Sequence, residues 1–261
     1  MTQAAPTVLR ELSGQAEFGL TLGLARAIWG EADQPEAPAL LQVVRKTGGL
    51  VAGVFSEDGA LQAYLVGLPT SDARVQHSHR LGVHPDARRR GLAERLKLFQ
   101  RQWCLERGIH EVRWTFDPLL IANAHLNIHR LGATVSSLLP DYYGAMPGIN
   151  AGLPSDRFEA DWRLGSERVE RHLSRAAVPT WPDPTLTLNP LLETLSAALP
   201  DALALDVPAD FARLRRQDPA LALVWRLKAR AVLSGLFDRG YVLTDVDLSR
   251  EQYLFTRGAR C

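Results

Sequence analysis

A single turn between a strand and a helix constrains this chain more than any other feature. Residues 75–83 alternate as a strand does, residues 88–93 read Arg-Arg-Arg-Gly-Leu-Ala, and an amphipathic helix runs on to about residue 107. Such a turn points successive backbone N–H groups at one spot in front of a helix N-terminus, where the helix dipole favours an anion. Small residues at 91 and 93 let a phosphate approach the backbone, and the arginines screen its charge. The turn is therefore a predicted phosphate cradle, although a solvated basic helix start would show the same six residues.

The elements around this turn predict a first domain with mixed helices and strands. Strand signals cover residues 7–12, 50–55, 60–68, 75–83, 111–116, 135–139 and 157–164, and helix signals cover 18–29, 39–46, 92–107 and 122–131. In the helix that follows the cradle, the predicted buried stripe consists of Leu92, Leu96, Phe99 and Trp103. We expect this domain to cover residues 1–164.

The rest of the chain predicts a connector and a smaller α+β domain. Residues 165–200 show weak periodicity around Pro179, Pro182, Pro184 and Pro190, which is typical of a connector. Residues 201–261 then give a strand, a short helix, a longer helix with Trp225 on its apolar face, and a hairpin. Because this order repeats the start of the chain, we expect the smaller domain to be a topological echo of the first half of the larger one.

Composition and charge exclude several classes of function. The chain has 30 Lys and Arg against 29 Asp and Glu, so its net charge of +1 gives no field that would draw it to nucleic acid or an anionic membrane. No run reaches the roughly 18 apolar residues of a membrane span, and residues 1–10 lack the features of a secretory signal. We therefore expect a cytoplasmic protein. Cys104 and Cys261 form no metal-ligand pattern, so we expect no metal.

The cradle and its surroundings resemble a known superfamily. Arg-x-x-Gly-x-Ala at residues 88–93, after Arg-Leu-Gly-Val at 80–83, resembles the signature of the GNAT acyl-CoA N-acyltransferases, and the order of elements up to residue 164 is similar to theirs. Residues 114–118, 123–127 and 148–152 look like those of a little-studied GNAT subfamily with a C-terminal extension. The resemblance implies an α+β fold whose central, mostly antiparallel sheet splays after the strand that precedes the cradle.

The resemblance also implies where an acyl-CoA binds. The pantetheine arm would enter the splayed sheet, the N–H of Val83 would polarise the thioester carbonyl, and the pyrophosphate would lie in the cradle. The cofactor-binding residues are then Leu81, Gly82, Val83, Arg88, Arg89, Arg90, Gly91, Leu92 and Ala93. Asn123 would hydrogen-bond the pantetheine or, equally, cap the helix 122–131. The donor would be acetyl-CoA or another acyl-CoA, and direct transfer to an amine needs no metal.

Direct transfer needs a base and an acid near the thioester. His79 and His77 are the ionisable residues of the strand before the cradle, and alternation puts both on one face. Each is also readily explained as a partly exposed sheet histidine without a role. The superfamily's usual acid is a tyrosine four residues before the glycine that closes the fourth helix, and here that position is Ile128. The remaining sources of a proton for the thiolate are His129, Tyr142, Tyr143 and bulk water.

The Gly-rich loop ahead of residue 157 is where we expect substrate specificity to be built. Asn150 and Arg157 are the predicted substrate-binding residues, and Arg157 would pair with a substrate carboxylate unless it forms a surface ion pair with Asp156 or Glu159. We expect transfer of an acetyl or other short acyl group, succinyl included, to the amine of a small molecule such as an amino acid. The alternatives are acylation of a protein N-terminus or lysine, and a non-catalytic acyl-CoA sensor or scaffold. The second domain would complete the acceptor pocket or support a homodimer.

Overall fold

The structure of the protein is a computed structural model that describes residues 7–145, 152–175, 184, 186–192 and 195–258. In it the chain forms two compact units. Unit 1 comprises the described residues up to Trp114, and unit 2 comprises those from Thr115 onward. The domain boundary that the sequence predicts near Leu164 remains a prediction.

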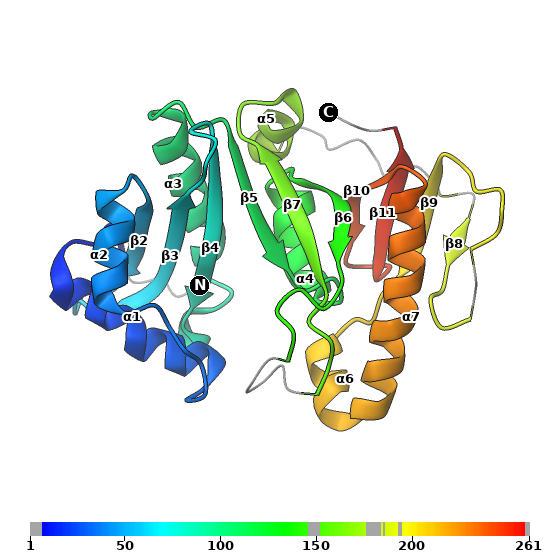
Figure 1. Cartoon of the computed structure of the whole chain (residues 1–261), viewed down its shortest axis with the longest axis horizontal. Coiled ribbons are helices and arrows are strands. Elements are labelled where there is room, and N and C mark those ends of the chain that lie inside the picture. Colours follow the sequence, from blue (N-terminus) through cyan, green and yellow to red (C-terminus); the bar gives the residue numbers. More distant parts are fainter. Residues whose placement is uncertain (1–6, 146–151, 176–183, 185, 193–194, 259–261) are drawn as a thin grey trace, which may run out of the picture. The chain divides into compact units, whose positions relative to one another are not determined.

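Unit 1 is built on neighbouring strands in the order β1-β2-β3-β4-β5. The strands are β1 (Val8–Glu11), β2 (Leu50–Phe55), β3 (Leu61–Pro69), β4 (Val75–Val83) and β5 (Glu111–Phe116), and of these pairs β4–β5 is the parallel one. Helices α1 (Gly14–Trp29) and α2 (Pro38–Lys46) cover one face, and α3 (Leu92–Leu105) covers the other (Figure 1). This mixed, mostly antiparallel sheet with helices on both faces is the fold class that the sequence predicts.

The central strands of unit 1 are buried on both faces. Val51, Tyr64 and Val66 pack with Phe18 of α1 and Leu41 of α2 in one apolar cluster. The residues between them in β2 and β3 are buried as well. Burial on both sides explains why these strands read in the sequence as nearly continuous apolar runs.

A bulge in β4 changes which side chains face which helix. The register of β4 against β3 shifts by one residue, so that His79 is the extra residue between Ser78 and Arg80. Before the bulge, Ser78 hydrogen-bonds to a side chain of α3. After it, Arg80 lies over the ring of Trp29, and a Cβ at Gly82 would come within 2.7 Å of that ring. Even-numbered residues of β4 therefore face α3 before the bulge and α1 after it.

Unit 2 holds neighbouring strands in the order β7-β6-β10-β11-β9-β8. These are β6 (Thr134–Leu139), β7 (Arg157–Arg163), β8 (Thr187–Leu188), β9 (Ala202–Asp206), β10 (Tyr241–Asp247) and β11 (Gln252–Arg257). The helical elements are α4 (Ile121–Ala124), the π-helical segment η2 (His125–Arg130), α5 (Glu167–Ser174), α6 (Phe211–Gln217) and α7 (Pro219–Asp238). Helix α7 packs along the strands of this unit (Figure 1), where Phe237 contacts Phe158 and Phe255.

The predicted connector contains more secondary structure than its composition indicates. Ser166 is the N-cap of helix α5, and its hydroxyl accepts a hydrogen bond from the N–H of Val169 at 3.3 Å. The short strand β8 follows later in the chain. The sequence prediction missed α5 because Val169 and His172 are its buried residues, which are too few to show a helical period. The predicted helix 122–131 is present, but its second half is the π-helical segment η2.

Two long helices bury charged residues that the sequence prediction did not place in the core. Lys97 is buried in α3, whereas Phe99 is half-buried. Arg226 is buried in α7, whereas its neighbour Trp225 is half-buried. Phe99 and Trp225 are therefore not the fully buried positions that the sequence predicts, because a long cation takes the place next to each of them.

The last elements of the chain do not repeat the strand order of its start. Strand β9 pairs with β11, the second strand of its hairpin, whereas β1 pairs with β2, the first strand of its hairpin. The order of elements repeats, but the predicted topological echo is wrong.

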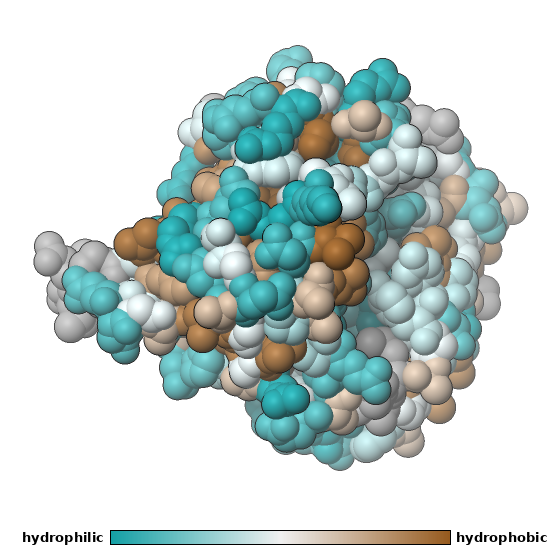
Figure 2. All heavy atoms as spheres, turned by 60° about the vertical axis from the view of Figure 1, so that its left-hand side comes forward, coloured by the Kyte–Doolittle hydropathy of each residue, from teal (hydrophilic) through white to brown (hydrophobic). Residues whose placement is uncertain are grey.

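Apolar side chains on the surface of unit 1 are interspersed with polar ones. Leu20 of α1 and Leu40 and Val43 of α2 are exposed, and in Figure 2 brown and teal side chains alternate on the side of the molecule that comes forward. In the described part of the chain, no helix is both long enough and apolar enough to cross a membrane.

Candidate functional site

The cradle lies between the end of β4 and the start of α3. After the 3-10 turn η1 (Pro85–Ala87), Arg89 and Gly91 have left-handed backbone angles, with φ of 62° and 72°, and α3 begins at Leu92. The N–H groups in the first turn of an α-helix have no carbonyl partner within that helix, and left-handed residues help to gather such groups around an anion. The exposed residues of the turn are Arg88, Arg89, Arg90 and Gly91. The turn thus presents guanidinium groups and the positive end of the helix dipole, which fit a pyrophosphate.

The space in front of Gly91 is open. A Cβ at Gly91 would meet nothing within 4 Å, so no protein atom requires a glycine there. The positive φ is what favours glycine at this position. The next residues anchor the helix, since Leu92 is buried and Ala93 half-buried.

The edge of β4 offers backbone groups next to the cradle. Its register with β5 runs from Val75 to His77. The N–H of His84 donates to a carbonyl of β3 at 2.8 Å. Because consecutive N–H groups along a strand point to opposite sides, those of Val83 and Leu81 point away from β3. These two groups are the ones that the sequence assigns to the pantetheine arm and to the thioester carbonyl.

A carboxylate from the loop between α1 and α2 holds His79 on the bulge. The Nε2 atom of His79 lies 2.8 Å from Oε1 of Glu36, and the same oxygen lies 3.2 Å from Nε of Arg80. Burial opposes the ionisation of Glu36, but the hydrogen bond from His79 and the charge of Arg80 outweigh it, so the pKa of Glu36 lies below its ordinary value. A neutral His79 that donates its Nε2–H to this carboxylate carries its lone pair on Nδ1, where it can take up a proton.

His77 lies beside His79 on the same face, as alternation predicts. The centroids of the two rings are 6.3 Å apart. Burial, followed by the positive charge on His79 and Lys97, lowers the pKa of His77. A lowered pKa makes His77 a weak base, so His79 with its carboxylate is the better placed of the two.

A buried polar network beneath β4 ties that strand to α3. Nζ of Lys97 donates to Oγ of Ser78 at 2.9 Å and to Oε1 of Gln100 at 3.1 Å, and it lies 3.7 Å from the centroid of the Trp114 ring. Gln100 donates in turn to Oε1 of Gln76 at 2.6 Å. Burial lowers the pKa of Lys97 from its ordinary 10.5 to about 7. The network holds α3, and with it the cradle, against the part of β4 where its pairing with β5 ends.

In unit 2 the segment η2 presents two histidines next to a carboxylate. Nδ1 of His129 lies 2.8 Å from Oδ1 of Asp245 on β10, and the ring of His125 stacks on that of His129 with centroids 4.7 Å apart. Burial, with the nearby positive groups, lowers the pKa of His125 to about 4. Asp245 therefore orients His129, whereas Ile128, at the position of the superfamily's tyrosine, is fully buried.

The remaining polar candidates of unit 2 lie around the loop before β7 and on α4. Tyr142 and Tyr143 are exposed, and the hydroxyl of Tyr143 lies 3.0 Å from that of Thr115. Asn123 is exposed within α4, whose N-cap is Leu120, so its predicted role as a helix cap is wrong and its role toward the pantetheine remains a prediction. Asn150 lies outside the described residues.

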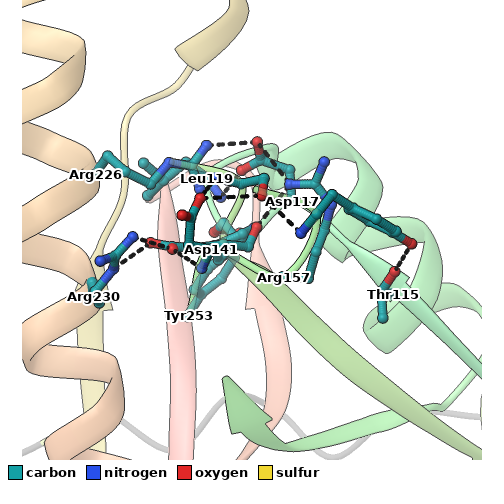
Figure 3. Close-up of polar contacts among 12 residues, drawn as sticks. Thr115, Asp117, Leu119, Asp141, Arg157, Arg226, Arg230 and Tyr253 are labelled. Atoms are coloured by element: carbon teal, nitrogen blue, oxygen red, sulfur yellow. Dashed lines mark hydrogen bonds and ion pairs between the residues drawn. The ribbon is translucent and has the colours of Figure 1, made fainter. Parts of the chain in front are cut away.

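Arg157 is a buried residue rather than a surface one. Its Nη1 donates to the carbonyl of Asp156 at 2.8 Å and lies 4.0 Å from Oδ2 of Asp117, and Figure 3 shows it with Arg226 beside that carboxylate. The carboxylate of Asp156 is bound by Arg230. Because Arg157 is buried, its predicted place in a surface ion pair is wrong.

The candidate residues fall into one group in each unit. Unit 1 brings together the two histidines of β4, the strand edge and the cradle, and unit 2 brings together the residues around η2 and those around β7. Glu36, Lys97, Asp117 and Arg226 are the neighbours that the sequence prediction missed. Among the residues that the structure describes, no three His, Cys, Asp or Glu side chains come close enough to hold a metal ion.

Unit 1 thus combines a candidate phosphate cradle, a strand edge and a histidine held by a carboxylate. Residues 20–129 match the model of the acetyltransferase (GNAT) family, and over this segment the chain is a GNAT N-acetyltransferase. A further C-terminal region lies beyond the matched segment. No curated protein matches the sequence.

Solved structures of low sequence identity have the same fold. The protein yncA of Salmonella typhimurium, assigned as an acetyltransferase and solved with its cofactor acetyl-CoA, is 18% identical with a TM-score of 0.51, over 62% of this chain and 96% of its own. The ribosomal-protein-S18-alanine N-acetyltransferase of Escherichia coli is 14% identical with a TM-score of 0.51, over 62% and 96%. An N-acetyltransferase of Staphylococcus aureus Mu50 is 13% identical with a TM-score of 0.51, over 61% and 99%. At these identities the likeness shows the fold and does not identify the acceptor.

Proposed function

We propose that this protein moves an acetyl or another short acyl group, such as succinyl, from coenzyme A to the amine of a small molecule such as an amino acid. The observation that carries this proposal is the pair formed by His79 of β4 and the ionised Glu36 of the loop between α1 and α2, in the same compact unit as the cradle. The pyrophosphate would be held by the cradle and the pantetheine by the N–H groups of Leu81 and Val83.

In the proposed reaction His79 is the base. Its Nδ1 takes the proton from the attacking ammonium or amine, while Glu36 on Nε2 stabilises the imidazolium that forms. The new C–N bond forms as the C–S bond of the thioester breaks, and sulfur leaves as a thiolate that is protonated by solvent or by a side chain. His129, oriented by Asp245, is our candidate for that side chain, and Tyr142 and Tyr143 are the alternatives.

The first experiment tests the cofactor site. Thermal unfolding is followed with acetyl-, succinyl-, malonyl- and free coenzyme A, since a ligand at a hundred times its dissociation constant stabilises the fold by about 2.7 kcal/mol. Gly91→Glu is the test variant, because its carboxylate would stand where the pyrophosphate binds. We expect coenzyme A affinity to fall about a hundredfold after allowance for solvent screening. Gly108→Glu is a matched control at the other end of α3, with the same φ of 72° and the same open space. Equal losses in both variants would contradict the cradle assignment.

The second experiment tests the base. Release of free thiol is followed with a panel of amines in wild type, His79→Asn, Glu36→Gln and the control His110→Asn, an exposed histidine beyond α3. We expect His79→Asn to lower kcat by about two orders of magnitude or more with little change in acyl-CoA affinity, and Glu36→Gln to lower kcat and shift the pH–rate profile. An unchanged pH–rate profile in His79→Asn would remove His79 as the base. Binding of acyl-CoA without thiol release from any amine would favour the sensor function instead.

A further inference from the structure

Helix α7 carries a buried arginine whose hydrogen-bonding capacity is only partly used. Arg226 is 2% exposed and lies on the apolar stripe of the helix, between Ala222 and Ala229. One of its terminal nitrogens, Nη2, donates to Oδ2 of Asp117 at 2.6 Å, and its guanidinium lies 5.0 Å from the ring centroid of Phe211. Its Nε and Nη1 are buried and have no hydrogen-bond partner. Leaving charged donors unpaired in the interior is costly, so this geometry calls for a ligand.

A second buried guanidinium approaches the same carboxylate. Nη1 of Arg157 lies 4.0 Å from Oδ2 of Asp117, the oxygen that Arg226 binds. The two arginines reach Asp117 from β7 and from α7 (Figure 3). Burial lowers the pKa of Arg157, and the charge of Arg226 lowers it further against the opposing effect of Asp117. Both guanidinium groups act on the one carboxylate of Asp117, and so does the charge of Arg215, so that an additional anion would balance the positive charge here.

The frame around these two arginines is fixed by hydrogen bonds of its own. Asp156, next to Arg157 in the chain, binds Arg230 of α7 through both carboxylate oxygens and accepts from the N–H of Asp141 at 2.9 Å. Asp141 accepts from the N–H of Ser155 at 3.0 Å. The Arg230 pair is therefore satisfied one helical turn away from Arg226, which is not. This contrast points to Arg226 as the group with a ligand still to bind.

One side of the cluster reaches the surface. The side chain of Arg157 is 10% exposed, and the exposed ring of Tyr143 lies 5.2 Å from its guanidinium. Guanidinium groups in such an arrangement bind a carboxylate through charge-assisted hydrogen bonds.

We propose that Arg226, together with Arg157, forms a carboxylate-binding site of unit 2 whose ligand has the chemistry of one of the two substrates of the proposed acyl transfer. This inference rests on the proposed function for the identity of those substrates. The carboxylate has two sources in that reaction, the α-carboxylate of an amino-acid acceptor and the distal carboxylate of a dicarboxylic acyl group such as succinyl. The chemistry of recognition is the same for both.

The test measures binding to the full-length protein and needs no turnover. Calorimetric titration compares L-amino acids with their amides, and succinyl-CoA with acetyl-CoA, in wild type, Arg226→Met and Arg226→Lys. We expect wild type to favour the carboxylate form in one of the two pairs, and Arg226→Met to lose that preference by about tenfold to a hundredfold while it keeps its affinity for the uncharged partner. Arg226→Lys keeps the charge but not the planar fork, and should lose part of the preference.

Arg239→Met is the control, because it removes an arginine at the C-cap of the same helix, whose Nη1 donates to the carbonyl of Ser196 and not to Asp117 or Asp156. It is expected to lower stability and to leave the preference for the carboxylate unchanged. A loss confined to the amino-acid pair would assign the site to the acceptor, and a loss confined to the acyl-CoA pair would assign it to the donor. If the folded Arg226→Met protein discriminates both pairs as wild type does, or if wild type shows no preference in either pair, the inference fails. Absence of thiol release with any amine would contradict the proposed function and would leave this binding test in force.

Discussion

The buried Lys97 should make the stability of the protein depend on pH in a window where few other groups titrate. Burial lowers the pKa of Lys97 to about 7, whereas a lysine in the unfolded chain keeps its ordinary 10.5. Between these values the unfolded chain binds a proton that the folded protein does not, so the free energy of unfolding rises with pH in this window and is flat below it. At about 1.4 kcal/mol per pH unit, and with only half of that slope at pH 7, the gain from pH 7 to pH 9 is about 2 kcal/mol.

The prediction is tested by comparing wild type with Lys97→Met. Methionine fills a similar volume without the amine, and the loss of its hydrogen bonds to Ser78 and Gln100 costs the same free energy at every pH in the window. Urea unfolding at pH 7, 8 and 9 gives the free energy of unfolding of each protein. His77 and Cys104 are present in both proteins, so the part of their titration that does not depend on the charge of Lys97 cancels in the difference. We expect the stability of wild type to rise by about 2 kcal/mol relative to the variant.

An exposed lysine supplies the control. Lys46 is exposed at the end of α2, in the same unit, so Lys46→Met should give a curve parallel to that of wild type. If the Lys97→Met curve is also parallel to that of wild type from pH 7 to pH 9, the amine keeps an ordinary pKa, and the argument from burial is refuted.

Three further predictions follow from the packing. Gly82→Ala should destabilise the protein by about 1–3 kcal/mol in urea unfolding, because the new methyl group would lie 2.7 Å from the Trp29 ring, whereas Gly23→Ala, with nothing within 4 Å, should not destabilise it. Ser166→Ala removes the side-chain cap of α5 and should lower the melting temperature by an amount that corresponds to about 1 kcal/mol; an unchanged value would mean that the cap contributes nothing. The thiol of Cys104, whose pKa burial raises to about 12, should react with a disulfide reagent at pH 8 about a thousandfold more slowly in the folded protein than in urea, measured after replacement of the C-terminal cysteine. Comparable rates in both states would contradict its burial.

The regular elements and the cradle were predictable from the sequence because each has a local signal. Strands β2 to β5 and helices α2 and α3 lie within two residues of the predicted ranges, since their apolar periods are long enough to recognise, whereas α1 begins four residues before its predicted range. The backbone of Gly91 is left-handed, as a glycine ahead of a helix suggests. Helix α5 was missed because a short helix with few buried residues has no detectable period.

The partners of the site residues were not predictable, because they come from distant parts of the chain. Glu36 binds His79 across 43 positions, and Arg226 binds Asp117 across 109. A single sequence carries no signal that residues so far apart in the chain form a hydrogen bond. A signal did exist for the two buried cations, since Lys97 and Arg226 each occupy a place on the apolar stripe of an amphipathic helix. A long side chain with a charged end is usually assumed to reach solvent from such a place, and here it does not.

The bulge at His79 also governs how the sequence of β4 can be compared with that of any other strand. Because one residue is added, a comparison that carries strict alternation through the whole of β4 assigns every position beyond the bulge to the wrong side. Deletion of His79 would remove the bulge, so that Arg80 would follow Ser78 directly and regular alternation would keep Ser78 toward α3 and Arg80 toward Trp29. Strand β4 thus consists of two short segments whose even-numbered residues face opposite sides of the sheet. The residue that joins the two segments is His79, which we propose as the base.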